Sequence, residues 1–331
     1  MMRIRIIKPG ILSTIQDLGR NNYLSQAVPV SGAMDTLSAR IANMAIGNND
    51  NAAVIEFTYA DAEFMTETDT LIAYAGDGAI LQVGDLVIPA EKPVFIPAYT
   101  SVQLVNNPAG SRTYMAIGGG FDVPEVLGSR STFITAKLGG FEGRNLQAGD
   151  TLSSAETLTS TTANIFYRLK GETITYPAWS IAHRMFMPAD TKRIRVVPAH
   201  EFSWFHGLAI VNFLSEPYTL SMNSNRMGYH LDGEPITRII KNELLSTAVT
   251  PGTIQVTGNG SMVLLMADCQ TTGGYPRIAQ VAAVDLPLCG QLKPGDTIYF
   301  EDISHQNAEM LYIEREHELQ QLREAIQQKY L

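Results

Sequence analysis

Cysteine and charge are both scarce in this chain. Among its 331 residues, Cys269 and Cys289 are the two cysteines, and their spacing matches no zinc or redox motif. Charged residues make up 17% of the sequence, and the acidic excess gives a formal net charge of −9. The arginines are scattered singly and form no basic stripe that could neutralise phosphates. This composition argues against nucleic acid and anionic membranes as partners.

Long hydrophobic runs and targeting signals are missing as well. The most apolar stretch, residues 262–267, is far too short to span a bilayer, which takes about 20 apolar residues. The amino terminus shows no basic segment followed by an apolar one, so it does not resemble a secretion signal. Together with the two cysteines, this favours a reducing environment, and we expect a cytoplasmic protein.

Several motifs of common enzyme classes are absent. No glycine is followed by lysine, which excludes a Walker-type phosphate loop. The glycines at 76–78 and 118–120 do not have the spacing or context of a dinucleotide fingerprint and are interpreted as turns. His200 and His206 are too far apart for the usual zinc-binding histidine pair of a helix. No Gly-x-Ser-x-Gly run indicates a serine hydrolase, and no metal site is predicted.

What is present reads mostly as β-strands. Short segments rich in β-branched and aromatic residues recur along the chain and are bounded by Gly, Pro, Asn or Asp. This spacing is typical of sandwiches or barrels. The expected strands are residues 54–58, 70–75, 94–96, 102–105, 113–117, 194–197, 254–256, 262–266 and 278–284.

Two helices interrupt this pattern. Asp35 can cap a helix in which Leu37 and Ile41 recur on one face, and Gly47 can end it. A second helix is expected over about residues 306–330. We interpret it as a tail that packs on the body of the protein or on a partner.

The length of the chain favours two domains. A Ser/Thr-rich tract at 153–162 has little apolar content, and a boundary is expected after it. The turn at 147–152 returns at 292–298, and residues 53–58 are echoed at 253–257, which fits two related β-rich halves around a cleft. The expected parts are a first domain of residues 1–185, a second domain of 186–303 and a C-terminal helix of 304–331.

Two loops stand out as candidate binding segments, residues 14–20 and residues 268–276. Both are built from small, polar and turn-forming residues that do not resemble core. Such a loop is either a structural turn or a place where the backbone approaches a ligand. Because one loop lies in each half, we expect a shared site.

An ordered series of motifs runs along the chain, opening with residues 8–20 and 28–35. Further segments are Asn43, 47–48, 118–119, 121–124, 127–132, 138–140, 226–229, 251–252, 254–256 and 270–276. Together these motifs resemble the biotin-dependent carboxyltransferase-like family, and the resemblance extends from Ile7 to about Phe300. The chain departs from the family pattern at Cys269, where a cation is usual, and this removes a possible anchor for an anionic ligand.

This resemblance implies a fold and a set of functions. The family's fold is two cyclophilin-like β-barrel domains that face each other across a cleft, with few helices. The family includes the C subunit of bacterial 5-oxoprolinase, which the chain resembles most because it has no Ala-Met-Lys-Met-like biotin acceptor. That resemblance implies ATP-dependent hydrolysis of 5-oxo-L-proline to L-glutamate, in a complex with proteins that resemble the A and B subunits of 5-oxoprolinase. The chain itself is expected to bind no cofactor tightly.

Two alternatives remain open from the sequence. The family also contains the carboxyltransferase domain of urea carboxylase, which implies transfer to urea or another amide from carboxybiotin. It contains a regulatory protein as well, which binds and antagonises a kinase inhibitor that resembles the B subunit of 5-oxoprolinase. Neighbouring genes would separate these functions.

Residues of the matching motifs are the candidate site residues. Arginines can clamp a carboxylate, and amides and hydroxyls can hold a carbonyl and an N–H group. The alternative for each is structural, with the aspartates capping turns, the methionines in the core and Arg20 in an internal salt bridge. The candidate catalytic residues are Asp17, Arg20, Arg226, Asp268 and Gln270. The candidate substrate-binding residues are Gln16, Ser31, Met34, Asp35, Met227, Thr271, Thr272, Gly273, Gly274 and Tyr275.

Overall fold

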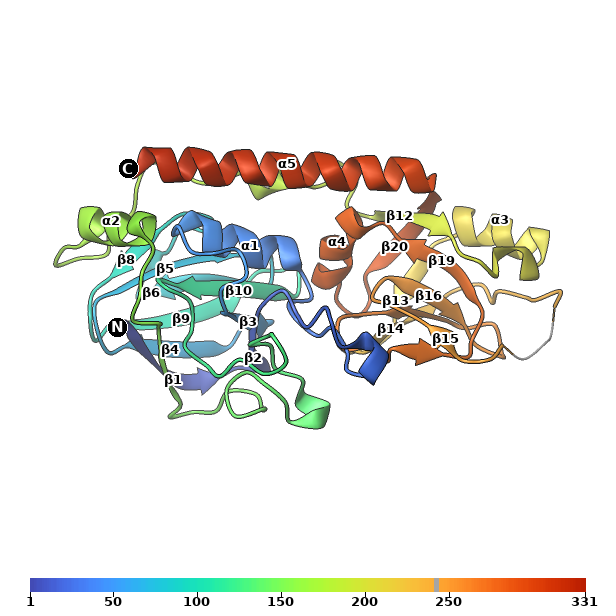
Figure 1. Ribbon diagram of the computed structural model, residues 1–331, viewed down its shortest axis with the longest axis horizontal. Helices are drawn as coiled ribbons and strands as arrows, with labels where there is room; N and C mark the ends of the chain where they lie inside the picture. Colours follow the sequence, from blue (N-terminus) through green and yellow to red (C-terminus); the bar gives the residue numbers. More distant parts are fainter. Residues whose placement is uncertain (241–243) are drawn as a thin grey trace. The chain divides into compact units, whose positions relative to one another are not determined.

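Strands make up most of the regular structure, as the sequence predicts. The computed structural model describes residues 1–240 and 244–331 (Figure 1). Contacts between residues divide the chain into two units, each described here by itself. Unit 1 consists of Met1–Gly19, Asp35–Met185 and Glu318–Leu331, and unit 2 consists of Arg20–Met34 and Phe186–His317. Within the described ranges, no helix combines the length and the apolar content that crossing a membrane requires.

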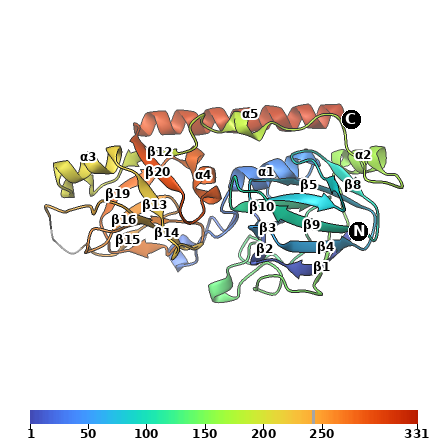
Figure 2. The same cartoon turned by 180° about the vertical axis from the view of Figure 1, so that it is seen from behind.

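Unit 1 is built on two antiparallel sheets (Figure 2). The strands of the first sheet are β1 (Arg3–Pro9), β4 (Ala62–Thr66), β6 (Ala79–Val83), β7 (Leu86–Val87), β9 (Ser101–Asn106) and β11 (Thr151–Ser153), in the order β11-β1-β4-β9-β6-β7. Those of the second are β2 (Leu12–Gln16), β3 (Val54–Thr58), β5 (Thr70–Ala75), β8 (Val94–Ile96) and β10 (Arg112–Ile117), in the order β2-β3-β10-β5-β8.

Helix α1 (Thr36–Ala45) packs on strands β5 and β10, which are buried at every position. Asp35 caps it, because its carboxylate accepts a hydrogen bond of 2.9 Å from the backbone N–H of Ser38. Gly47 follows the helix with a φ of +74°, and a Cβ at this position would lie 2.7 Å from Cγ2 of Thr161. The predicted helix, its cap and its glycine end are confirmed.

Helix α2 (Ser160–Leu169) was not expected from the sequence. It begins inside the Ser/Thr-rich tract, where the hydroxyl of Thr159 accepts a hydrogen bond of 3.0 Å from the N–H of Thr162. The tract therefore supplies a helix cap. The side chain of Ile165 is fully buried and packs the helix on the rest of unit 1. Short 3₁₀ turns complete the unit at η2 (Ile134–Ala136) and η3 (His183–Phe186), the latter continuing into unit 2.

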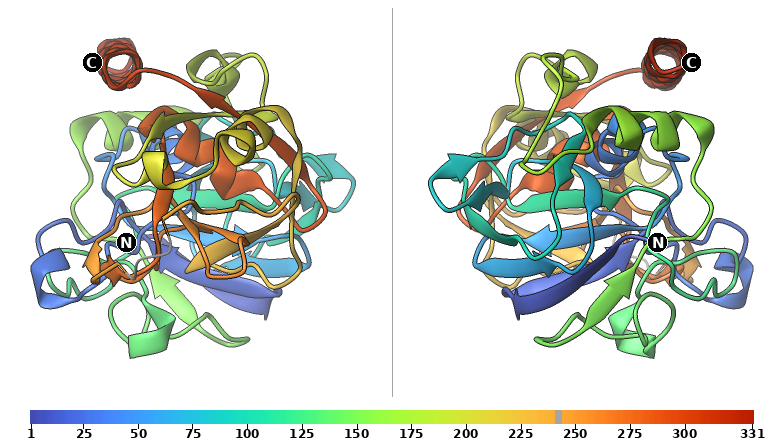
Figure 3. Two further views of the ribbon diagram at one scale, coloured as in Figure 1. Left: turned by 90° about the vertical axis from the view of Figure 1, so that its right-hand side faces the viewer. Right: turned by 90° about the vertical axis from the view of Figure 1, so that its left-hand side faces the viewer.

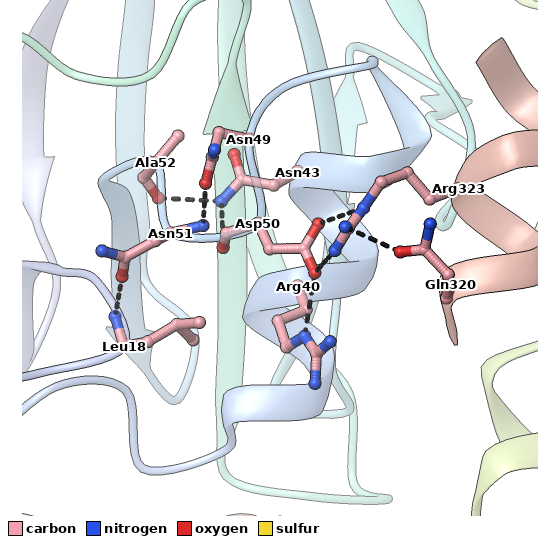
Figure 4. Close-up of polar contacts among 9 residues, drawn as sticks. All are labelled: Leu18, Arg40, Asn43, Asn49, Asp50, Asn51, Ala52, Gln320 and Arg323. Carbon is pink, nitrogen blue, oxygen red and sulfur yellow. Dashed lines mark hydrogen bonds and ion pairs between the residues drawn. The ribbon is translucent and has the colours of Figure 1, made fainter. Parts of the chain in front are cut away.

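The end of the chain is attached to unit 1 around Asp50 (Figure 4). Helix α5 (His305–Lys329) carries Arg323, whose Nε donates to Oδ1 of Asp50 over 3.2 Å. Arg40 of α1 donates from its Nε to Oδ2 of the same carboxylate over 3.1 Å. One nearly buried carboxylate thus joins two helices. The predicted C-terminal helix is confirmed.

The described part of unit 2 forms a closed barrel of seven strands (Figure 3). They are β12 (Arg193–Pro198), β13 (Tyr218–Leu220), β14 (Gly228–Asp232), β16 (Thr253–Val256), β17 (Met262–Leu265), β19 (Arg277–Val281) and β20 (Thr297–Asp302). They follow the order β12-β19-β16-β17-β14-β13-β20, and β20 closes the barrel by pairing with β12 in parallel. A separate two-stranded ribbon joins β15 (Thr247–Ala248) and β18 (Thr272–Gly273).

Helix α3 (Gly207–Ser215) packs on β20 and contributes to the barrel core. Its Phe213 stacks on Phe300 with ring centroids 4.7 Å apart, and the ring of Tyr218 lies beside both. This unit also contains the 3₁₀ turns η1 (Leu24–Gln26), η4 (Phe202–Trp204) and η5 (Ala283–Asp285), and the helix α4 (Leu286–Gln291). Helices α3 and α4 were not predicted.

The strand expected over residues 278–284 is too long. Strand β19 ends at Val281, and the chain turns at once into η5 and α4. Asp285 explains the turn, because its buried carboxylate accepts hydrogen bonds from the backbone N–H and the Nε of Arg195, at 2.8 and 2.9 Å. This partner lies on a strand far away in the sequence, so local pattern does not reveal it.

His183 and Glu91 form a hydrogen-bonded pair in unit 1, shortly before the chain enters unit 2 at Phe186. Nδ1 of His183 hydrogen bonds to Oε1 of Glu91, and the backbone N–H of His183 donates to Oε2 over 3.2 Å. Burial by itself would lower the pKa of His183, but the bond to Glu91 and the charges of Glu91, Asp77 and Asp35 outweigh it. The pKa of His183 is therefore raised above its usual 6.5.

This raised pKa makes the stability of unit 1 depend on pH. The charged pair contributes fully at pH values below the unfolded pKa of about 6.5, and the contribution is lost as pH rises through the folded pKa. We expect Glu91→Gln to lower the free energy of unfolding by about 1–3 kcal/mol near pH 6 and by much less at alkaline pH. Denaturant unfolding at a series of pH values measures this difference.

Glu142→Gln is the matched control, because the partner of Glu142 is Arg144, which stays charged throughout this range. Its effect should be the same at every pH. A Glu91→Gln effect that grows with pH would contradict the assignment.

Candidate functional site

Three segments of unit 2 meet beside the barrel. The N–H of Ser31, in the segment Arg20–Met34, donates to the carbonyl of Ala267 over 2.9 Å. The N–H of Asp268 donates to the carbonyl of Arg226 over 2.9 Å. The sequence-predicted residues on these segments, far apart along the chain, are thereby brought together within one unit.

Arg226 lies at the centre of this meeting point. Its Nε and Nη2 donate to the two carboxylate oxygens of Asp268 over 2.8 and 3.2 Å, and Nη2 also donates to the carbonyl of Gly32 over 2.6 Å. Arg226 and Asp268 are both buried. The guanidinium that we expected to clamp a ligand carboxylate thus holds an internal carboxylate and the loop that contains Gly32.

The segment Arg20–Met34 has a constrained backbone. The N–H of Arg20 donates to the carbonyl of Val30 over 2.7 Å, and Ser31 and Gly32 both have left-handed φ angles, +55° and +83°. Such a conformation is unfavourable for serine, and strain of this kind gathers at functional sites. The hydroxyl of Ser31 is buried without a hydrogen-bond partner among the described residues. Met34 lies in the barrel core, which is the structural alternative for this residue.

Residues 270–276 form a loop around the β15–β18 ribbon. The N–H of Val249 donates to the carbonyl of Thr271 over 3.0 Å, and the Thr271 side chain is buried. The side chains of Gln270, Thr272 and Tyr275 are exposed. An amide, a hydroxyl and a phenol are therefore available on one loop for hydrogen bonds with a ligand. Gly274 and Met227 are exposed too.

Cys269 separates this loop from Asp268 and is not a nucleophile. Burial, and to a smaller extent the charge of Asp268, raises the pKa of its thiol to about 12. The thiol is therefore protonated at neutral pH. It packs against Val249 and Leu265.

A salt bridge that the sequence did not reveal closes the loop at its far end. Arg277 donates from Nε and Nη2 to the two oxygens of Glu201, both at 2.7 Å, and from Nη1 to the carbonyl of Ala248 over 3.2 Å. The hydrogen bonds from Arg277 lower the pKa of Glu201. In the sequence, Glu201 stands out only beside His200, in the metal site that the histidine spacing excludes.

In unit 1, Asp17 lies in the turn after β2. Its carboxylate accepts four hydrogen bonds, from the N–H of Gly19 (2.8 Å), the hydroxyl of Ser129 (2.6 Å), the N–H of Arg130 (2.6 Å) and the hydroxyl of Ser131 (2.5 Å). Three of these donors reach Oδ1 and the N–H of Arg130 reaches Oδ2, so both oxygens of the carboxylate are engaged. These contacts fit a structural role for Asp17, because its carboxylate joins the turn after β2 to the loop at residues 129–131. Residues 127–132 matched the family pattern, and that match was the available signal for this partner loop.

Gln16 and Asp35 are also in unit 1. Nε2 of Gln16 donates to Oγ1 of Thr14 (2.9 Å) and to the carbonyl of Thr132 (3.2 Å). Its Oε1 is buried and has no hydrogen-bond partner in the described part of the chain. An unpaired buried acceptor is unfavourable by about 1–3 kcal/mol, so an N–H group from a ligand would stabilise it. Asp35 is the cap of α1 described above.

The candidate residues thus fall into two sets. Unit 2 holds the Arg20–Met34 segment, the Arg226–Asp268 pair and the exposed loop, while unit 1 holds Gln16, Asp17 and Asp35. Each set, taken by itself, includes amide or hydroxyl groups that can bond to a carbonyl or an N–H of a ligand. In the described ranges, no group of three or more His, Cys, Asp or Glu side chains is arranged to hold a metal ion.

Comparison with known proteins shows relatives of nearly the same length. The chain is 34% identical over 305 residues to the 5-oxoprolinase C subunit of Escherichia coli K12, covering 92% of this chain and 93% of the relative. It is 33% identical over 323 residues to the protein of the same name from Haemophilus influenzae, with 96% of each chain covered.

The fold is also found inside larger enzymes. The crystal structure of the Kluyveromyces lactis urea amidolyase superposes with a TM-score of 0.85 at 28% identity and covers 97% of this chain. The chain spans about a fifth of that protein, 20% of its length. Residues 26–302 match the family model described as carboxyltransferase domain, subdomains A and B. The mainly β fold with its barrel and C-terminal helix agrees with this family, and the chain belongs to it.

Proposed function

We propose that this chain acts as the C subunit of a bacterial 5-oxoprolinase. In this proposal it works with partners that resemble the A and B subunits of that enzyme, in the ATP-dependent hydrolysis of 5-oxo-L-proline to L-glutamate. The chain supplies substrate-binding groups, binds no cofactor tightly and is active only in the complex.

The proposal is supported by the large share of each chain that aligns with the other. The chain and the 5-oxoprolinase C subunits of two bacteria each cover more than nine tenths of the other, at 33–34% identity. The urea amidolyases that match at 31–32% identity are covered to only 17% of their length. The match over nearly the whole length of these relatives therefore supports the function that their name states.

The polar groups suit a lactam. A lactam presents one carbonyl acceptor and one N–H donor, and it resists hydrolysis because its amide resonance must be broken. Transfer of the terminal phosphoryl group of ATP to the amide oxygen, with release of ADP, would weaken that resonance. Water would then add to the ring carbon and expel the ring nitrogen, and a second water would hydrolyse the acyl phosphate to glutamate and phosphate. Within unit 2, the exposed amide of Gln270 carries both a donor and an acceptor for such a ring.

Carboxyl transfer is the second candidate function. The likeness to the K. lactis urea amidolyase supports it, because the fold agrees over 97% of this chain. Urea also carries a carbonyl and N–H groups, so the same side chains would suit it. A biotin carboxylase and a biotin carrier protein would have to act with this chain. A regulatory role remains the third candidate, and it would need partner binding but no cleavage.

Gln270→Ala tests the ligand-binding role of the exposed loop. In a complex reconstituted with the A and B partners, we expect the change to lower kcat/KM for 5-oxoproline by one to three orders of magnitude, because a positioned donor worth about 1.5–4 kcal/mol is lost. Its melting temperature should stay close to that of the wild type, since the side chain is exposed.

Gln147→Ala is the matched control, an exposed glutamine of unit 1 that lies outside the candidate residues. Normal cleavage by Gln270→Ala would remove this residue from the site. A wild-type complex that opens no 5-oxoproline, yet carboxylates urea with a biotin carboxylase and carrier, would favour the second function.

Arg226→Ala should act mainly on stability. The change leaves the Asp268 carboxylate buried without its partner, and we expect a loss of about 3–5 kcal/mol in the free energy of unfolding. Denaturant unfolding measures this loss. Arg193→Ala removes an exposed ion pair with Asp190 and should change stability by less than about 1 kcal/mol. A stable Arg226→Ala chain that lacks activity would instead indicate direct contact with substrate.

The chain alone should bind ATP weakly or not at all. Its sequence contains no Walker-type loop, because no glycine precedes a lysine. Titration calorimetry with Mg-ATP should therefore give no submicromolar binding to the isolated chain, with the full complex as the positive control. Tight binding by the isolated chain would overturn this division of labour within the complex.

A further inference from the structure

A buried amide lies beneath the exposed loop of unit 2. Gln255 is part of strand β16, and its side chain is 2% exposed. The loop above it contains Gln270, Gly273 and Tyr275, and Gln255 approaches all three. Its own strand is tied to the end of the loop as well, because the N–H of Val256 donates to the carbonyl of Pro276 over 2.9 Å.

The hydrogen bonds of Gln255 fix the direction of two amides. Its Nε2 donates to the backbone carbonyl of Tyr275 over 3.4 Å, and its Oε1 accepts from Nε2 of Gln270 over 3.4 Å. A carbonyl can only accept, so Gln255 must turn its NH₂ group toward Tyr275 and its oxygen toward Gln270. Gln270 must then turn its own NH₂ group inward. The orientation of the buried Gln255 amide therefore fixes the orientation of the exposed Gln270 amide.

Close packing holds the buried amide in place, because bonds of this length are weak by themselves. A Cβ built on Gly273 would lie 2.4 Å from Nε2 of Gln255, and its next contacts would be with Cδ and Oε1 at 3.3 and 3.4 Å. The backbone of Gly273 is not left-handed, so the loop geometry does not require glycine there. The close approach of the Gln255 amide is the reason for glycine at this position.

We propose that Gln255 is a positioning residue that orients Gln270 for a cyclic secondary amide. With one N–H of Gln270 engaged by Gln255, its Oε1 and second N–H remain for a ligand. A lactam ring carries its N–H and C=O on one edge, so it can donate to this Oε1 and accept from this N–H. This inference rests on the proposed function, because it names the lactam edge as the group that Gln270 recognises.

The chain contains a matched control for Gln255. Gln280 of the neighbouring strand β19 donates from Nε2 to the carbonyl of Pro251 over 2.9 Å, and its amide lies under Gly252 as that of Gln255 lies under Gly273. Its contacts hold the turn before β16 and do not include Gln270. Methionine has nearly the shape of glutamine without its hydrogen-bonding groups. Gln255→Met and Gln280→Met therefore remove the same groups, at a buried position and at a half-buried one.

The first measurement does not depend on activity. Hydrogen exchange of the isolated chain, followed by mass spectrometry, reports how firmly residues 270–276 are held. We expect Gln255→Met to speed exchange in this loop about tenfold, and Gln280→Met to leave the loop unchanged. Gly273→Ala should act like Gln255→Met, because its Cβ displaces the Gln255 amide. Equal exchange in the two glutamine variants would overturn the proposal.

The second measurement is a double-mutant cycle in the reconstituted complex. Gln255→Met should lower kcat/KM for 5-oxoproline about tenfold in the wild-type background and have almost no effect when Gln270 is already alanine. Gln280→Met should change kcat/KM less than about twofold in either background. Effects of Gln255→Met and Gln270→Ala that simply add would show that Gln255 does not act through Gln270. If the wild-type complex opens no lactam, the proposed function fails, while hydrogen exchange still decides whether Gln255 holds the loop.

Discussion

The ion pair between Arg226 and Asp268 is the interaction on which the candidate site of unit 2 depends. It joins the loop before β14 to the loop after β17, and it holds the carbonyl of Gly32 in the segment Arg20–Met34. Removing one partner of a buried pair leaves an uncompensated charge. This lowers the free energy of unfolding more than replacing both partners by apolar residues of similar volume. The strained backbone at Ser31 persists because this pair and the bond to Ala267 hold it on both sides.

Carboxamides are prominent among the candidate groups of each unit taken by itself. Gln16, Gln255 and Gln270 each have an NH₂ group that donates to an oxygen of the protein. A neighbouring carbonyl fixes which end of Gln16 and Gln255 is the donor, because carbonyl oxygens cannot donate. Oε1 of Gln16 and Gln270 is then left as an acceptor for N–H. Neutral groups of this kind suit the amide edge of a ligand, and the thiol of Cys269 beside them is neutral as well.

Several predicted site residues have structural partners. Asp17 accepts four hydrogen bonds within unit 1, Asp35 caps α1 and Met34 lies in the barrel core. Their positions within the family motifs are explained by these contacts, because a motif can be specific for the loop geometry that positions a ligand. The groups with hydrogen-bonding capacity to spare are the hydroxyl of Ser31, Oε1 of Gln16 and the exposed side chains of the loop at 270–276.

The sequence by itself determined nine strands, helix α1 with its Asp35 cap, helix α5 and membership of the family, because these depend on local periodicity, capping and ordered motifs. The nine strands are β3, β5, β8, β9, β10, β12, β16, β17 and β19, and the others, among them β1 and β2, were not predicted. Tertiary structure alone decided the rest. Arg226 finds Asp268 42 positions away, and β19 ends early because Asp285 binds Arg195 on another strand. Helix α3 was not predicted because nearly all of its side chains are apolar. Its sequence therefore shows no polar face that would mark the periodicity of a helix. Which polar groups are satisfied, and which remain for a ligand, depends on such contacts between distant residues.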